Sequence, residues 1–296
     1  MAESLSQTKG RRRNGMDEPE LFSHEFSSLL SEDLLLCPIC VDVFTDPVTT
    51  PCGHNFCKSC LTQCWDKSQH SHCPLCKEKF TKRPELKINT TLREVADHFK
   101  KKIVSTELKR IQQYAVDVNL DPDTAHPSLI LSADGKQVTH GDTRQNLPDT
   151  PQRFNPCICV LGKQSFSSGK FYYEVQVRGK TDWSLGVMKE NINRKRQIFL
   201  TPQNGFWTVW LRNENQYKAC ADPAVPLTLR EKLEVVGVFV DYEEGLVSFY
   251  DVKSRSHIYS FTGQSFTEKL YPYFCPCLND EGKNSASLII SSVFKT

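Results

Sequence analysis

The sequence lacks any long apolar run and any strong excess of charge. No segment of its 296 residues approaches the roughly 18 consecutive apolar residues that a membrane-spanning helix needs. The opening segment, MAESLSQTKGRRRNG, has charges where a secretory signal has an apolar core, so we expect no export and a reducing compartment. A hydrophobic content of 39% and a charged content of 24% are typical of a soluble globular protein. The formal net charge of +2 gives no indication of a nucleic-acid partner.

Cysteine is absent between Cys76 and Cys157, although the chain contains 13 in all. Eight of them lie within residues 37–76, in Cys-x-x-Cys steps together with a histidine. In a reducing compartment this spacing indicates metal ligands rather than disulfides. The ligand order is C-x2-C-x11-C-x-H-x2-C-x2-C-x12-C-x2-C, made by Cys37, Cys40, Cys52, His54, Cys57, Cys60, Cys73 and Cys76.

Eight ligands of this kind predict two zinc ions. Zinc that is held by four protein ligands is structural and has no place for an activated water, so we expect no zinc hydrolase. A segment of about forty residues buries too little apolar surface to fold alone, and structural zinc contributes roughly 10–16 kcal/mol. Spacing alone leaves open whether the two sites are sequential or interleaved.

Further histidines and cysteines lie near these ligands. His70 and His72 are interpreted as exposed loop residues, because the set of eight ligands is complete without them. Cys64 is interpreted as a partly buried helix residue rather than a thioester-forming nucleophile, because no basic partner is placed beside it.

Two Cys-x-Cys pairs occur later in the chain, at Cys157 and Cys159 and at Cys275 and Cys277. Residues i and i+2 of a strand face the same side, so a third metal site is geometrically allowed. We favour packing in a core, because small buried cysteines are common there and no histidine motif accompanies these pairs.

The segments around the cysteine-rich region differ in character. Residues 1–19, with the cluster Arg11 to Arg13, are expected to be disordered, and Phe22 to Leu30 predicts a short helix. Apolar residues at spacings of three and four predict a second helix from Thr90 to about Ala115. Residues 77–110 contain eleven Lys or Arg against five Asp or Glu, which favours a solvated helix face over RNA binding.

After Pro122 the chain alternates short apolar segments with turn signals. FYYEVQV, WSLGVM, FWTVWL, VVGVFV and LVSFY are rich in β-branched and aromatic residues and are separated by Gly, Asn, Ser and charged residues. Many short strands without an intervening helical period predict an antiparallel sandwich. The expected division is 1–19, 20–36, a zinc finger at 37–77, a basic linker helix at 78–115 and the sandwich at 116–296.

The ligand order, with histidine fourth and the Cys-x-His step, resembles the RING finger rather than the PHD finger or the LIM domain. The resemblance implies a cross-brace of two interleaved zinc sites. Their ligands are Cys37, Cys40, Cys57 and Cys60 for the first ion and Cys52, His54, Cys73 and Cys76 for the second.

A RING finger implies a ubiquitin ligase that positions a ubiquitin-charged conjugating enzyme without forming a covalent intermediate. The residues that match its apolar docking groove are Ile39, Trp65, Pro74 and Leu75. Lys77 stands where many RING ligases carry a cation, often Arg, that contacts both ubiquitin and the enzyme. An ammonium is a point donor and lacks the planar fork of a guanidinium. The lysine therefore bears on how strongly the finger can activate ubiquitin transfer.

The region from Tyr114 to Phe294 resembles a PRY-SPRY domain. The matching phrases are VDVNLDPDTAHPSLILSADGKQV, FYYEV, DWSLGV, NGFWTVW and VDYEEGLVSFYDV. Together with the RING, this resembles the tripartite-motif family of ubiquitin ligases. That family usually also has a B-box and a long coiled coil, both of which this sequence lacks. A homodimer through the helices that flank the RING remains an open alternative.

A PRY-SPRY domain implies recognition of a protein target by loops at one end of the sandwich. Trp210, Arg212 and Leu278 occupy matching positions, although Arg212 and Leu278 stand where some relatives carry aromatics. Trp183 and Trp207 are expected in the core.

The sequence thus predicts a ubiquitin ligase whose partners are a conjugating enzyme, ubiquitin and a protein target. Because the N-terminus has no secretory signal, we expect a cytoplasmic location, with the nucleus as an additional one. The family resemblance implies a role in innate immunity. The competing hypothesis is a non-catalytic adaptor that binds zinc and acts through protein contacts alone.

Overall fold

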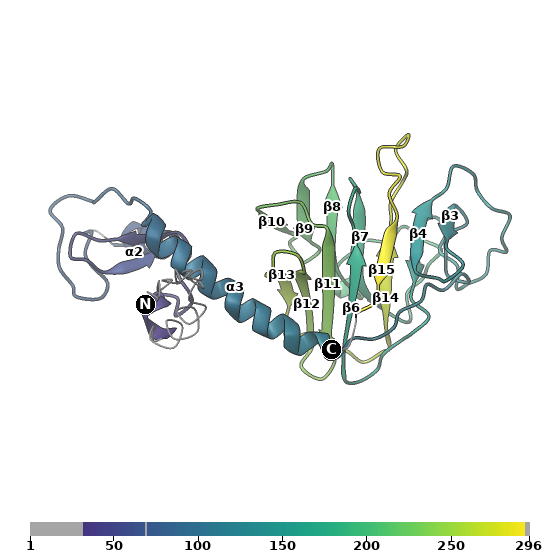
Figure 1. Ribbon diagram of the computed structural model, residues 1–296, viewed down its shortest axis with the longest axis horizontal. Helices are drawn as coiled ribbons and strands as arrows, with labels where there is room; N and C mark the ends of the chain where they lie inside the picture. The colour runs from purple at the N-terminus through teal and green to yellow at the C-terminus, as the bar shows by residue number, and fades with distance from the viewer. Residues whose placement is uncertain (1–31, 69, 294–296) are drawn as a thin grey trace, which may run out of the picture. The chain divides into compact units, whose positions relative to one another are not determined.

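The computed structural model describes residues 32–68 and 70–293, which fall into two compact units divided between Asp97 and His98. Figure 1 shows the helices and strands of each unit, coloured along the chain. The disorder predicted for residues 1–19 and the helix predicted for Phe22 to Leu30 lie outside the described residues. Among the described helices, none is long and apolar enough to cross a membrane.

The first unit contains the zinc-finger sequence and is built from short elements. They are the 3-10 helix η2 (Glu32–Leu35), the strands β1 (Pro47–Thr49) and β2 (Asn55–Cys57) and the helix α2 (Lys58–Asp66). The two strands pair antiparallel, with Val48 opposite Phe56. Both of these side chains are buried, as are Leu61 and Trp65 from α2. So few buried side chains make a small core.

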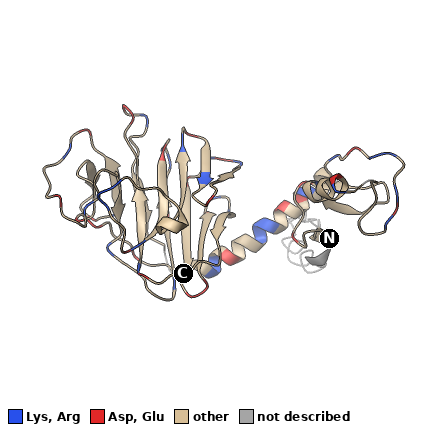
Figure 2. Cartoon of the chain, turned by 180° about the vertical axis from the view of Figure 1, so that it is seen from behind, with Lys and Arg blue, Asp and Glu red and all other residues tan. Residues whose placement is uncertain are grey.

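The helix α3 (Thr90–Gln112) begins where the sequence pattern predicts it. The side-chain oxygen of Asn89 accepts a hydrogen bond from the N–H of Leu92 at 3.0 Å, which caps the first turn. Charges of both signs lie along α3 (Figure 2). Near its end, Leu108 and Ile111 are buried with Tyr172, Phe239 and Tyr250 of the sandwich strands. The last turns of α3 therefore belong to the packing of the second unit.

Two antiparallel sheets make up the second unit (Figure 1). The six-stranded sheet has the order β10 (Val225–Leu227), β9 (Gln216–Ala219), β8 (Phe206–Arg212), β7 (Trp183–Lys189), β14 (Leu270–Cys275), β5 (Val160–Leu161). The seven-stranded sheet has the order β13 (Ser256–Phe261), β12 (Leu246–Asp251), β11 (Val235–Asp241), β6 (Lys170–Gln176), β15 (Leu288–Ser291), β4 (Gln137–His140), β3 (Leu129–Leu131).

The central strands are buried on both faces, which explains why their sequences are almost continuously apolar. In β6, Phe171 and Tyr173 face the core between the sheets, whereas Tyr172 is covered by the end of α3. On the six-stranded sheet, Met188 and Phe206 are likewise buried outside the main core. The expected fold class, a small zinc finger, a short helix and an antiparallel sandwich, is confirmed.

Candidate metal centre and binding pocket

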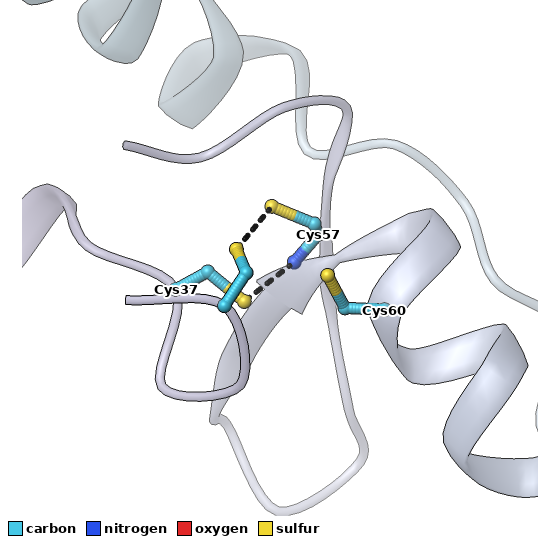
Figure 3. Close-up of side chains that lie close together, drawn as sticks. Cys37, Cys57 and Cys60 are labelled. Atoms are coloured by element: carbon cyan, nitrogen blue, oxygen red, sulfur yellow. Dashed lines mark hydrogen bonds between the residues drawn. The ribbon is translucent and has the colours of Figure 1, made fainter. Parts of the chain in front are cut away.

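The first group of metal ligands gathers four cysteines from three segments of the finger. Cys37 and Cys40 lie in the loop after η2, Cys57 ends β2 and Cys60 is in the first turn of α2 (Figure 3). The four sulfurs lie within 4.8 Å of one another, and those of Cys40 and Cys57 are 4.0 Å apart. Tetrahedral zinc with Zn–S bonds of about 2.3 Å separates its sulfurs by roughly 3.8 Å, so the group fits zinc.

The second group contains Cys52, His54, Cys73 and Cys76, again within 4.8 Å of one another. The Nδ1 atom of His54 is 3.4 Å from the sulfur of Cys52 and 3.6 Å from that of Cys73. This ring nitrogen therefore faces the thiols and is the ligand atom. The two groups are the interleaved sets that the RING resemblance implies, and the chain holds two zinc sites.

Backbone hydrogen bonds act toward the thiolate form that zinc requires, although burial and the neighbouring thiols raise the pKa of Cys57 overall. The N–H of Thr45 donates to the sulfur of Cys57 at 3.2 Å, and the N–H of Cys57 donates to the sulfur of Cys37 at 3.4 Å. Burial acts to raise the pKa of Cys52, but hydrogen bonds from Thr50 and His54 outweigh it and lower that pKa to about 6. In the folded finger these hydrogen bonds therefore favour the thiolate of Cys52, which is the form that binds zinc.

The remaining histidines and cysteines of the described residues stand apart from these sites. His70 is exposed, His72 is partly exposed, and neither belongs to a group that could hold a metal. Cys64 is partly exposed. Among the described residues, the two Cys-x-Cys pairs of the sandwich form no such group either.

Apolar side chains are exposed on the loops that carry the ligands. Ile39 is 38% exposed and Leu75 is 53% exposed, and Pro74 between the last two cysteines is partly exposed. Val41, which the sequence interpretation did not single out, is more exposed than either. Its position one residue after Cys40 is the signal that could have identified it.

Lys77 follows the last zinc ligand in a left-handed backbone conformation, with φ of +64°. Its ammonium donates a hydrogen bond to the carbonyl oxygen of Pro74 at 2.8 Å and is exposed. The cation is therefore held beside the loop that carries Leu75.

Trp65 lies inside the finger rather than on this exposed face. Its side chain is 2% exposed, and its indole N–H donates to the carbonyl oxygen of His72 at 2.8 Å. Phe80 packs edge-on against the indole, and the guanidinium of Arg83 lies 5.7 Å from its ring centre. In this structure Trp65 stabilises α2 and the last zinc loop from within.

The sandwich has a pocket of about 590 Å³ beside the ends of β7, β8 and β14. Its walls include Asp182, Arg212, Cys275, Leu278 and Asp280. Of the residues expected to bind a target, Arg212 and Leu278 thus line one pocket. Trp183 and Trp207 are buried, which agrees with their predicted place in the core.

Trp210, the third expected residue, lies next to the pocket between two cations. The guanidinium of Arg212 is 5.0 Å from its ring centre and the ammonium of Lys218 is 5.5 Å away. Arg212 also donates to the carbonyl oxygen of Trp183 at 2.7 Å and to the hydroxyl of Ser184 at 2.9 Å. These bonds fix the guanidinium at the wall of the pocket.

The side chain of Asn284 joins the two loops that form one wall of the pocket. Its oxygen accepts hydrogen bonds from the N–H groups of Thr181 and Asp182, at 3.0 and 3.2 Å. Its amide group donates to the carbonyl oxygens of Asp182, Pro276 and Leu278. Asn284 is buried, and sequence reasoning missed it because no motif marks it.

Family models match three parts of the chain. A RING-type zinc finger matches residues 37–72, the SPRY-associated domain PRY matches residues 118–166, and the SPRY domain matches residues 170–288.

Several curated proteins are similar in sequence. Mouse (Mus musculus) erythroid membrane-associated protein is 47% identical over 62% of this chain and 32% of its own length. Human (Homo sapiens) pyrin is 45% identical over 73% of this chain and 27% of its own. Rat (Rattus norvegicus) E3 ubiquitin-protein ligase TRIM69 is 49% identical over 58% of this chain and 34% of its own. The chain therefore spans roughly a third of the length of these relatives.

Solved structures show the same fold for the sandwich. A TRIM65 PSpry domain has a TM-score of 0.53 at 22% identity and covers 63% of this chain and 95% of its own. A stonustoxin structure has a TM-score of 0.53 at 26% identity over 60% of this chain and 29% of its own. The chain therefore contains a RING-type zinc finger, a PRY domain and an SPRY domain, and its homologues include the tripartite-motif protein TRIM69.

Proposed function

We propose that the chain is a RING-type ubiquitin-protein ligase that recruits its target through the PRY-SPRY domain. The observation that carries this proposal is the exposure of Ile39 and Leu75 on the two loops that the zinc ligands hold. The Lys77 ammonium is held at the carbonyl oxygen of Pro74, the residue before Leu75. One relative, TRIM69, is named an E3 ubiquitin-protein ligase, whereas the names of pyrin and erythroid membrane-associated protein state no ligase activity.

In the proposed reaction, the finger positions the ubiquitin-charged conjugating enzyme and forms no bond with ubiquitin itself. Zinc supplies rigidity when it is bound, and all eight ligand positions belong to the protein. Ile39, Pro74 and Leu75 provide an apolar surface for the conjugating enzyme. Lys77 offers an ammonium that can donate to ubiquitin and to the enzyme at once. Holding the thioester near a target lysine then accelerates transfer by orientation, without a covalent intermediate on this chain.

Self-ubiquitination with a panel of conjugating enzymes tests this proposal. We expect chains with at least one enzyme, and we expect Ile39→Ala to reduce the rate at least tenfold at unchanged zinc content. Ile130→Ala is the matched control, because Ile130 is an exposed apolar residue of the sandwich. Absence of chains with every enzyme would support the non-catalytic adaptor instead.

We further propose that the pocket with Arg212 and Leu278, flanked by Trp210, receives the protein target. Its support is the fixed guanidinium and the exposed Leu278 at its wall, joined by Phe199, which is 70% exposed on the loop that contributes Ile198 and Leu200. Phe199 was missed because the sequence does not show which loop borders the pocket.

Partner capture by the full chain tests the pocket. We expect a target that the wild type retains and that the double variant Arg212→Ala, Leu278→Ala loses, while Ile130→Ala retains it. A partner that the double variant still binds as well as the wild type would place the target surface elsewhere.

A further inference from the structure

The target pocket is lined by four cysteines that the proposed ligase reaction does not use. They come from two segments, Cys157 and Cys159 before β5 and Cys275 and Cys277 at the end of β14. All four are free thiols, and all except Cys159 are partly exposed. Thiols gathered in one pocket are chemically distinctive, because an oxidant can join two of them in a disulfide.

Cys275 lies between two other thiols. Antiparallel pairing of β5 with β14 sets Val160 opposite Phe274, so the next step of the same register brings Cys159 opposite Cys275. Cys159 is buried, and its sulfur is 2.8 Å from the hydroxyl of Tyr273. Cys159 therefore already has a hydrogen-bond partner and is screened from solvent.

The sulfur of Cys277 is 3.7 Å from that of Cys275 on the other side. Cys277 has a φ of +60°, and this left-handed residue turns the chain so that its sulfur lies back toward Cys275. A disulfide has an S–S bond of about 2.05 Å, so the two sulfurs need to approach by only about 1.7 Å. Both side chains are partly exposed and reach the pocket from one short segment.

Charges of both signs lie near this pair, because Asp182 and Asp280 line the pocket together with Arg212. Arg212 lines the same pocket and acts to lower the pKa of Cys277, although the hydrogen bond with Cys275 and burial outweigh it and raise that pKa. The ammonium of Lys180 donates to the carbonyl oxygens of Asn284 and Ala286, at 3.2 and 2.9 Å, and interacts with both thiols electrostatically. The hydrogen bond with Cys159 and burial likewise raise the pKa of Cys275, so both thiols are protonated at neutral pH and react slowly.

We propose that Cys275 and Cys277 are a site of reversible oxidation, in which a small disulfide such as oxidised glutathione converts the two thiols to a disulfide at the wall of the target pocket. The thiolate of Cys277 attacks one sulfur of oxidised glutathione and releases a glutathione thiolate, which takes up a proton. Cys275 then loses its proton and attacks the Cys277 sulfur, which releases the second glutathione. Two thiols are oxidised and one glutathione disulfide is reduced to two glutathiones.

Closure of this bond has a direct consequence for the pocket. Leu278 follows Cys277 in the chain, and its carbonyl oxygen is held by Asn284. Drawing Cys277 toward Cys275 therefore shifts the wall that Leu278 forms. This regulatory meaning rests on the proposed target-binding function, whereas the chemistry of the pair does not.

Disulfide mapping of the zinc-loaded full chain tests the proposal without any target. The chain is equilibrated in mixtures of reduced and oxidised glutathione, its free thiols are blocked with iodoacetamide, and it is digested with trypsin. Cleavage after Lys269 and Lys283 yields one peptide with both cysteines of the pair, and cleavage after Arg153 and Lys163 yields a separate peptide with Cys157 and Cys159.

We expect more than half of the peptide 270–283 to carry an internal disulfide in excess oxidised glutathione, and reduced glutathione to reverse it, at unchanged zinc content. Cys157→Ser is the matched control and should leave this fraction unchanged. Cys277→Ser should abolish the internal disulfide. Full alkylation of both cysteines at every glutathione ratio, or a bond that joins the two peptides through Cys159, would overturn the proposal. Loss of ligase activity would not affect this result.

Discussion

The zinc finger and the sandwich reach a stable fold by opposite means. The finger has two three-residue strands and few buried side chains, and eight ligands tie its loops together. The sandwich has two large sheets and a continuous core of buried Val, Leu, Phe and Trp. Ligand spacing therefore determines the first fold, whereas the second depends on the total apolar area that many strands bury.

Removal of zinc should have a much larger effect on the folding of the finger than on the folding of the sandwich. A chelator removes a contribution of roughly 10–16 kcal/mol per structural zinc, so we expect the finger to unfold while the sandwich stays folded. Hydrogen exchange resolved by peptide measures this. Protection should disappear within residues 37–76 and persist in β6 and β11. Equal loss of protection in both units would show that the sandwich also depends on zinc.

A cavity in the sandwich should have the converse effect. Phe249 is fully buried in the core between the sheets, so Phe249→Ala should lower the free energy of unfolding of the sandwich by about 3–5 kcal/mol. Zinc content should not change. Urea unfolding measures the loss, and Phe199→Ala, which truncates an exposed phenylalanine, should cost less than about 0.5 kcal/mol.

Acid should weaken the sandwich through His126. Burial, the nearby Arg144 guanidinium and His140 lower the pKa of His126 to about 4. An unfolded chain binds this proton with a pKa near 6.5, so the stability that neutral His126 contributes is complete above about pH 6.5 and declines as the pH falls toward 4.

The expected loss across this pH range is on the order of 2–3 kcal/mol. Urea unfolding of the sandwich at a series of pH values measures it, and His126→Asn should flatten this part of the profile. An unchanged slope in the variant would assign the acid sensitivity to other groups.

The smallest expected effect concerns Lys77, which lies outside both cores. Lys77→Ala should slow discharge of ubiquitin to free lysine about three- to tenfold, because it removes one exposed cationic donor. Single-turnover discharge measures the rate, and Lys77→Arg should restore or exceed it because a guanidinium can bridge two acceptors. Zinc content should stay constant in both variants. Unchanged discharge in Lys77→Ala would remove this residue from the mechanism.

The sequence was most informative where chemistry imposes fixed spacing. Cys-x-x-Cys steps identified the zinc ligands, and the apolar runs of β6, β7, β8, β11 and β12 lie where strands were expected. Strands with mixed polarity, such as β9 and β13, were not singled out, because their partners along the sheet, rather than their own pattern, specify them.

Residues that act through tertiary contacts were the hardest to predict. Trp65 looks like a surface residue of a groove by its place in the motif, yet the small finger needs an aromatic core and buries it. The cluster of thiols around Cys275 depends on β5 lying beside β14, which connects segments more than a hundred residues apart. A role for Asn284 likewise depends on two loops that meet only in the folded chain.

The covering of Tyr172 by the end of α3 has a practical consequence for dissecting this protein. A fragment that starts at residue 116, where the PRY-like sequence begins, removes Leu108 and Ile111 and leaves Tyr172 and Phe239 open to water. Such a fragment exposes an apolar patch that is buried in the intact chain. Proteins would bind this patch non-specifically in a pull-down experiment. A fragment that begins at His98 keeps Leu108 and Ile111 over Tyr172, so it is the better fragment for capturing partners.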